Sequence, residues 1–114
     1  MAIITYPGTG KINVNRRELI EYFPDLSNRF RIVKPISATA LHCDIDVKIY
    51  VHGGGSNGQS YACGLATATA IKKMYPHLNN LLIKAKTTYC DTRTVEGKKT
   101  GKYKARKSYT YVRR

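Results

Sequence analysis

Apolar and polar residues alternate most regularly between Asp44 and His52. Every second position there is apolar: Ile45, Val47, Ile49 and Val51. A period of two predicts a half-buried strand with one apolar face. Cys43 falls on the same face, so the pattern predicts that it is a small core residue.

Two shorter apolar segments occur near the N-terminus, with a turn signal between them. AIITY covers residues 2–6, Pro7–Gly10 is the turn signal, and Lys11–Val14 alternates polar and apolar residues. This arrangement predicts a β-hairpin. Residues 15–17 form either a second turn or the N-cap of a short helix over Glu18–Phe23, which Pro24 ends.

Residues 25–42 show no period that assigns them to a helix or a strand. Their apolar side chains are nevertheless expected in the core: Phe30, Ile32, Val33 and Ile36.

A glycine-rich segment, Gly53–Gly58, breaks the strand and precedes a predicted helix capped by Ser60 or Asn57. Apolar and small residues recur there at helical spacing: Gly64, Leu65, Ala68, Ile71 and Tyr75. Pro76 is expected to end this helix and to start another. The second helix carries an apolar stripe, with Lys84 and Lys86 in its last turn: Leu78, Leu81, Leu82 and Ala85. The elements together predict an α+β sandwich with helices on one face of the sheet.

Charge divides the 114 residues into two unequal parts. The formal net charge is +13, from 20 Lys and Arg against seven Asp and Glu. Residues 1–83 contribute +4 and residues 84–114 contribute +9. We therefore expect a globular body over residues 1–90 and a basic tail over residues 91–114. Nucleic acid is the first partner class that such a charge indicates, ahead of an anionic membrane.

The glycine-rich segment allows three interpretations. A glycine loop between a strand and a helix can cradle a phosphate with its backbone N–H groups. The segment ends Gly58-Gln59-Ser60, however, without the Gly-Lys-Ser or Gly-Lys-Thr of a P-loop. It is otherwise a tight turn, or a turn that meets an RNA phosphate. No His, Cys or carboxylate arrangement indicates a catalytic or metal site.

Tyrosines alternate with cations in the tail, at Tyr103, Tyr109 and Tyr111. Lys and Arg neutralise phosphates and release counterions, and tyrosines stack on unpaired bases. The composition alone fits either a nucleic-acid-binding arm or a solvated basic tail that aids non-specific association.

Several motifs in a fixed order make the chain recognisable. They are PGTGKINVN at residues 7–15, ELIEYF at 18–23, DVKIYVHGGGSNGQ at 46–59, DTRTVEGKKTGKYKARK at 91–107 and the final Arg113-Arg114. Over nearly its whole length the chain resembles the ninth protein of the small ribosomal subunit, in its bacterial or organellar form. The triple-glycine loop followed by the KK-x-G-x-x-KAR tail is the most specific part of the resemblance.

The resemblance implies a non-enzymatic structural component of the subunit head. Its fold would be a two-layer α/β sandwich with a mixed sheet, a left-handed crossover and an extended basic C-terminal tail. Arg113 and Arg114 would contact the peptidyl-site tRNA, and the glycine loop would face RNA through Gly53, Gly54, Gly55 and Gln59. The rRNA-binding residues would be Arg93, Lys98, Lys99, Lys102, Lys104, Arg106 and Lys107.

The implied partners are small-subunit rRNA, peptidyl-site tRNA and neighbouring small-subunit proteins. No cofactor, membrane or small-molecule substrate is implied. The chain departs from the family at Gly97, where an Arg is usual, at Arg113, where a Lys is usual, and over residues 109–112. It also begins at the first strand, without the basic stretch that usually precedes it. This start and the composition favour a ribosome in an organelle, mitochondrion or plastid, over a bacterial-type cytoplasm.

Overall fold

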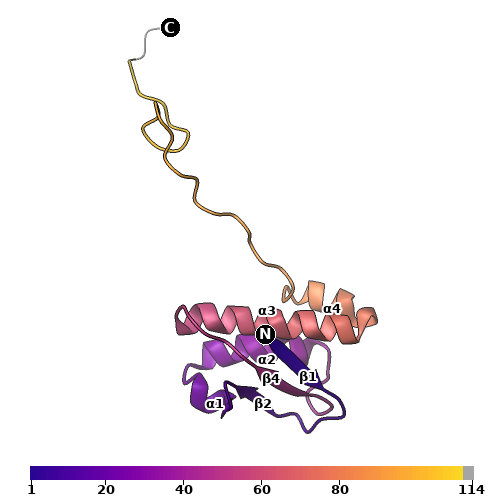
Figure 1. Cartoon of the computed structure of the whole chain (residues 1–114). Coiled ribbons are helices and arrows are strands. Elements are labelled where there is room, and N and C mark those ends of the chain that lie inside the picture. Colours follow the sequence, from indigo (N-terminus) through magenta and orange to yellow (C-terminus); the bar gives the residue numbers. More distant parts are fainter. Residues whose placement is uncertain (112–114) are drawn as a thin grey trace.

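The computed structural model describes residues 1–111, and they form a mixed sheet with helices packed on one side. The strand order is β1-β4-β2-β3, with β1 antiparallel to β4 and β2 parallel to it (Figure 1). The strands are β1 (Ala2–Thr5), β2 (Ile12–Val14), β3 (Arg17–Glu18) and β4 (Asp46–Ile49). The helices are α1 (Leu19–Tyr22), α2 (Leu26–Ala38), α3 (Ser56–Met74), the 3-10 helix η1 (Pro76–Leu78) and α4 (Asn79–Lys84).

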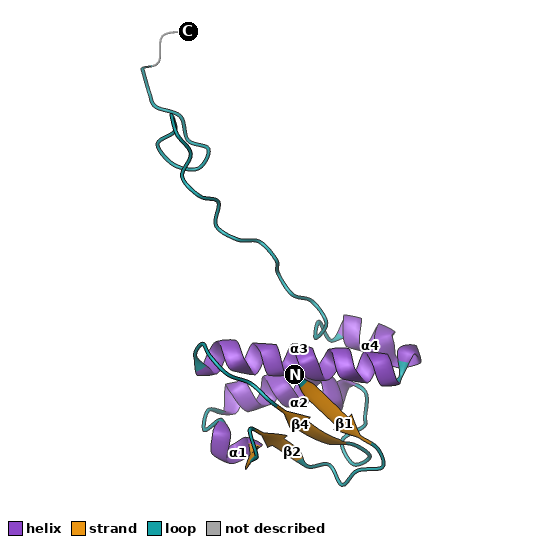
Figure 2. Ribbon diagram, in the orientation of Figure 1, coloured by secondary structure: helices purple, strands orange, loops and turns teal. Residues whose placement is uncertain are grey.

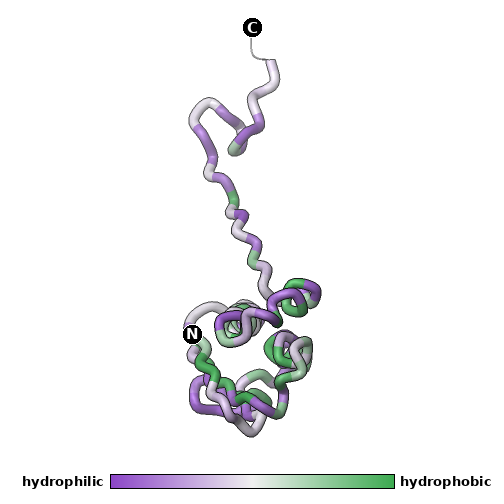
Figure 3. Tube along the Cα trace, turned by 90° about the vertical axis from the view of Figure 1, so that its right-hand side faces the viewer, coloured by the Kyte–Doolittle hydropathy of each residue, from purple (hydrophilic) through white to green (hydrophobic). Residues whose placement is uncertain are grey.

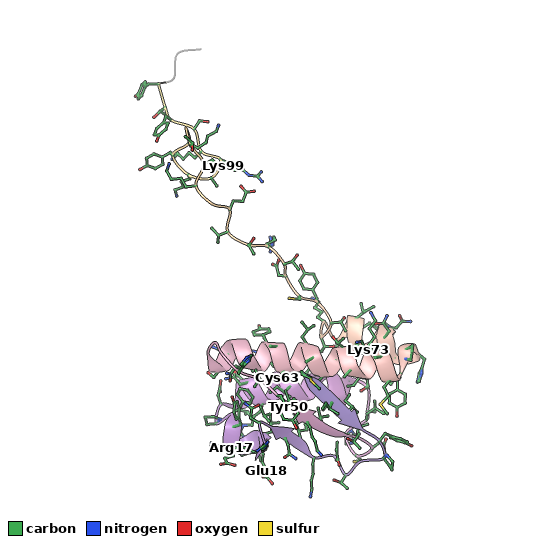
Figure 4. The ribbon with its side chains drawn as sticks, viewed as in Figure 1. Arg17, Glu18, Tyr50, Cys63, Lys73 and Lys99 are labelled. Atoms are coloured by element: carbon green, nitrogen blue, oxygen red, sulfur yellow. The ribbon has the colours of Figure 1, made fainter. Side chains whose placement is uncertain are left out.

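The core lies between the sheet and the two long helices, as an α+β sandwich requires (Figure 2). Strand residues Val14, Val47 and Ile49 are buried against helix residues such as Ile32 and Ile71. Cys63 of α3, labelled in Figure 4, belongs to the same core and is 1% exposed. The predicted α+β class with a mixed sheet is therefore confirmed. The left-handed sense of the β2-to-β4 crossover stays a prediction.

The predicted hairpin between residues 2–6 and 11–14 is wrong, because β4 lies between β1 and β2. The turn signal is real, but it marks a loop that passes around one end of β4. Gly8 N–H donates to the Asp44 carbonyl at 2.7 Å, and Lys11 carbonyl accepts from Val47 N–H at 2.9 Å. Alternation along two segments predicts strands, but it does not say whether a third strand separates them.

A two-residue turn follows β2, which settles the open choice at residues 15–17. Asn15 and Arg16 both have positive φ, at 49° and 69°, as a tight hairpin turn requires. β2 pairs antiparallel with β3 across this turn, and α1 begins directly after β3.

The segment without a visible period is the 13-residue helix α2. The Asp25 carboxylate caps its N-terminus by accepting from Ser27 N–H at 3.2 Å, and Pro35 lies inside it. Ile32 and Ile36 are buried as expected, but Phe30 is 64% exposed, contrary to expectation. Phe30 is two positions from Ile32, and that spacing places it on the opposite side of a helix.

Three further expectations are wrong in detail. Cys43 is exposed, because the chain still turns there and the strand begins only at Asp46. Neither Ser60 nor Asn57 caps α3, whose N-cap is Gly55 without a side-chain hydrogen bond. Lys86 lies beyond the last turn of α4, with φ of 54°. Pro76 begins η1 after α3 ends, as expected.

The C-terminal segment leaves the body after α4 and extends away from it (Figures 1 and 2). The radius of gyration is 19.7 Å, whereas a compact domain of this length would have about 13 Å. The principal extents are 70 × 32 × 20 Å. Hydrophilic residues predominate along the extension, while apolar residues gather in the body (Figure 3).

Candidate nucleic-acid interface

The basic tail residues that lie within residues 91–111 are accessible to a partner. All are exposed except Lys102, which is half-buried: Arg93, Lys98, Lys99, Lys102, Lys104, Arg106 and Lys107. Figure 4 shows Lys99 far from the body, while Lys73 lies on α3. A partner can therefore contact these cations without touching the sheet. Arg113 and Arg114, the predicted tRNA-binding residues, lie outside the described residues.

Two arginines of the tail are paired with its two acids. Arg93 Nη2 lies 2.6 Å from Asp91 Oδ2, and Arg106 contacts Glu96 through Nη2 at 2.7 Å and Nε at 3.0 Å. The arginines lower the pKa of both carboxyls through these hydrogen bonds, and the carboxylates raise the pKa of both guanidinium groups. Both pairs are exposed, so they are weak and can be exchanged for phosphate.

The tail doubles back on itself between Lys99 and Lys107. Tyr103 N–H donates to the Lys107 carbonyl at 2.7 Å, and Gly101 has a φ of 74°. Tyr103 and Tyr109 meet edge to face, with their centroids 6.1 Å apart. This compact loop groups the tail's cations and leaves two tyrosine rings at its surface, with 60% and 53% of Tyr103 and Tyr109 exposed.

The glycine loop lies at the N-terminus of α3, away from residues 93–107 of the tail (Figure 1). Gly53 and Gly54 have φ of 74° and 70°, and both are exposed. Residues other than glycine rarely adopt this conformation, so the two glycines are needed for the turn itself. The exposed glycines offer a partner backbone groups only.

Gln59, grouped with these glycines in the sequence, is half-buried and hydrogen-bonds within the body, and its RNA-facing role stays a prediction. Its Nε2 donates to the Gly53 carbonyl at 3.0 Å, and its Oε1 accepts from the Tyr22 hydroxyl at 3.1 Å. Tyr22 in turn accepts from Asn15 Nδ2 at 3.3 Å, and Asn15 binds the backbone of Val51 through both of its side-chain atoms. This network joins the glycine loop to α1 and to the β2–β3 turn.

A groove that the sequence pattern did not predict lies between α2, α3 and the chain after α4. Arg31 and Lys34 line it together with Tyr61, Lys86 and Tyr89. These residues come from three separate segments, so no motif in the sequence groups them. Only their spacing within α2, where Arg31 and Lys34 are three residues apart, could have placed two of them on one helix face.

Among residues 1–111, no group of three His, Cys, Asp or Glu side chains is placed to hold a metal ion. In the same range, no helix has both the length and the apolar character needed to cross a bilayer. A two-layer α+β body with an exposed cationic extension defines the class as that of small, strongly basic proteins, whose charge attracts polyanions.

Comparison with known proteins identifies the family within that class. The family model described as ribosomal protein S9/S16 matches residues 2–114, and the chain belongs to this family. Family membership makes it a structural ribosomal component rather than an enzyme. The interpretation of the glycine loop as the phosphate site of an enzyme is therefore set aside.

Individual relatives come from bacteria and from eukaryotes. The small ribosomal subunit protein uS9 of Chlorobaculum tepidum is 41% identical over 108 residues, which cover 95% of this chain and 84% of the relative. The small ribosomal subunit protein uS9m of Arabidopsis thaliana is 40% identical over 108 residues, 95% of this chain and 25% of the relative. That of Candida albicans is 42% identical over 107 residues, 94% of this chain and 32% of the relative. The chain thus spans most of the bacterial relative and a third or less of the two uS9m proteins.

Proposed function

We propose that this protein is a structural constituent of the small ribosomal subunit that binds rRNA through its tail and through the glycine loop. The observation that carries the proposal is the tail itself, a cationic segment that extends from the body of a ribosomal-family protein. The bacterial and uS9m relatives, all described as small-subunit proteins, support the assignment to that subunit.

The charge distribution gives the body and the tail different roles in binding rRNA. The folded body supplies a rigid shape that fits one place in the assembly, while the tail concentrates nine of the 20 Lys and Arg and a net charge of +7 in its 24 residues. Each Lys or Arg that meets a phosphate releases condensed counterions, which favours binding. In the free protein Asp91 pairs with Arg93 and Glu96 pairs with Arg106. On binding, rRNA phosphates replace these carboxylates as partners of the two arginines. Neutralisation by rRNA also removes the repulsion within the tail.

The proposal extends to the peptidyl-site tRNA. Arg113 and Arg114 match the tail tip of the family that the sequence resembles, and the described tail already reaches well beyond the body. We assign the tRNA backbone contact to these two residues, and rRNA contacts to the cations between residues 93 and 107. The partners then include small-subunit rRNA, tRNA and the neighbouring proteins of the subunit.

The first test is sedimentation of the tagged full chain through a sucrose gradient at high salt, with sequencing of the RNA that travels with it. We expect the chain to sediment with small subunits and their rRNA. Deletion of residues 97–114 should lower this retention, since it removes most of the tail's cations. A full-length chain that stays at the top of the gradient, free of rRNA, would refute the proposal.

Deletion of Arg114 alone separates the tRNA contact from the rRNA contacts. Subunits that carry this variant should form normally and bind peptidyl-site tRNA more weakly. Unchanged tRNA affinity in subunits that contain the variant would remove the tRNA part of the proposal and leave the rRNA part standing.

A further inference from the structure

The groove between α2, α3 and the chain after α4 is a cationic surface separate from the tail and the glycine loop. Its volume is about 310 Å³. Three cations line it, Arg31, Lys34 and Lys86, and no acidic residue is among the described residues around it. Two tyrosines stand at its sides, with 65% of Tyr61 and 77% of Tyr89 exposed.

Close packing of the two long helices brings these side chains together. A Cβ at Gly64 of α3 would lie 2.7 Å from the Arg31 carbonyl oxygen of α2, so only glycine allows this approach. Lys86 joins from the other side, because its positive φ of 54° redirects the chain after α4. The groove is thus part of the folded body.

Arg31 is held in place by neutral partners, and no carboxylate among residues 1–111 forms an ion pair with it. Its Nη1 donates to Asn28 Oδ1 and Asn57 Oδ1, both at 3.0 Å, and lies 3.4 Å from Ser60 Oγ. Its guanidinium carbon lies 4.3 Å from the centroid of the Tyr61 ring. The two ion pairs found within residues 1–111 are both in the tail and do not involve it. A guanidinium fixed in this way is pre-organised for a phosphate.

We propose that this groove is a second RNA-binding surface of the protein. A backbone phosphate lies against Arg31, Lys34 and Lys86, and the adjacent unpaired base stacks on Tyr89. This inference rests on the proposed function, since it adds a site on the body to the tail's contacts with the same rRNA. Cations next to exposed aromatic rings are the arrangement that binds unpaired nucleotides. An acidic protein segment would pair with the cations, but it would not stack on the exposed tyrosine ring.

The test compares two double variants of the full chain that remove equal charge. One is Lys34→Ala with Lys86→Ala, in the groove. The control is Lys72→Ala with Lys73→Ala, both exposed in the last turn of α3 and outside the groove. The probe is a fluorescein-labelled uridine oligonucleotide, and its Kd is measured over a range of salt concentrations. Circular dichroism melting verifies that both variants are folded.

We expect the groove variant to bind the oligonucleotide about tenfold more weakly near physiological salt, with a slope of log K against log salt smaller by about 1.4. The control should change both quantities much less. Tyr89→Leu should weaken binding about fivefold or more. Tyr6→Leu is the control, at a tyrosine that is also exposed (59%) but lies on the β1–β2 loop, and it should have little effect.

Three results would refute the proposal that the groove binds RNA, and they differ in what they imply for the proposed function. If the two double variants lose equal affinity for the oligonucleotide, the groove is not an RNA-binding surface. Sedimentation of the chain with small subunits would still support the proposed function. A groove variant that loses affinity for poly-glutamate as much as for RNA would indicate an acidic protein partner instead. A wild-type chain that neither binds the oligonucleotide nor sediments with subunits would refute both proposals.

Discussion

Asp46 fixes the loop between β1 and β2 with a single carboxylate. Its Oδ1 accepts from Thr9 N–H at 2.7 Å and from Lys11 N–H at 2.9 Å, and it lies 3.2 Å from the Thr9 hydroxyl. The Lys11 N–H, followed by the Thr9 N–H, lowers the pKa of this carboxyl below its ordinary value of 3.8. The loop must pass around the end of β4, so these contacts help to hold β1 and β2 on opposite sides of that strand.

Replacing Asp46 by Asn is expected to destabilise the fold at neutral pH. Because the folded pKa lies below the unfolded value, the carboxylate stabilises the fold in full above about pH 4. That contribution is lost as the pH falls through the folded pKa. Urea unfolding of wild type and Asp46→Asn between pH 7 and pH 2 should show a difference that shrinks at the acidic end. A difference that stays constant with pH would contradict this role for the carboxylate, and Asp44→Asn serves as the neighbouring control.

At the scale of elements, the contact between α2 and α3 organises the body and the groove. Gly64 permits the close approach, and buried polar groups add specificity beside it. Ser60 Oγ donates to Asn28 Oδ1 at 3.0 Å, and both residues are buried. A shift of either helix would break these contacts and separate Arg31 from Tyr61.

Two glycines of α3 provide a matched comparison of this packing. Gly64→Ala places a methyl group 2.7 Å from a backbone oxygen, and we expect a loss of about 1–2 kcal/mol in the free energy of unfolding after the gain in helix propensity. Gly58→Ala meets no atom within 4 Å and should raise the free energy of unfolding by up to about 1 kcal/mol. Urea denaturation measures both values. A stabilising Gly64→Ala would show that the helices can separate without cost.

At the scale of the whole molecule, the body and the tail are stabilised by different interactions. The body has a continuous apolar core. Apart from a 4.0 Å contact from Cys90 Sγ to the Asp91 carbonyl at the junction, the hydrogen bonds and ion pairs of residues 91–111 are made within the tail itself. The high charge of the tail favours an extended chain in the absence of RNA.

A chain that ends at Cys90 should therefore keep the stability of the full-length protein. We expect the free energy of unfolding to change by less than about 1 kcal/mol, which corresponds to a Tm shift smaller than about 4–8 °C. RNA affinity should fall steeply in the same variant, with a smaller salt dependence. Differential scanning calorimetry and oligonucleotide binding measure the two effects. A larger fall in Tm would mean that the tail also stabilises the body.

The strand Asp46–Ile49 and the helix after the glycine loop were predictable because each has a local period. Ile45, Val47 and Ile49 alternate, and Gly64, Ala68 and Ile71 share one helix face. Helix α2 was missed because Pro35, a residue type that usually ends a helix, lies inside it and the exposed Phe30 obscures its apolar face. The cationic residues of the tail were found from composition alone, since charge density does not depend on how the chain folds.

The sequence by itself determined the local elements that have a clear period, the concentration of charge in residues 84–114 and the resemblance to a ribosomal family. Tertiary structure alone decided that β4 separates β1 from β2 and that Gln59 hydrogen-bonds to Tyr22. It also decided which residues meet in one groove: Arg31, Lys34, Tyr61, Lys86 and Tyr89. The physical reason is the distance along the chain over which each property is set. Periodicity, turn signals and charge density are properties of neighbouring residues, whereas strand order and the approach of two helices depend on how distant segments bury their apolar faces together.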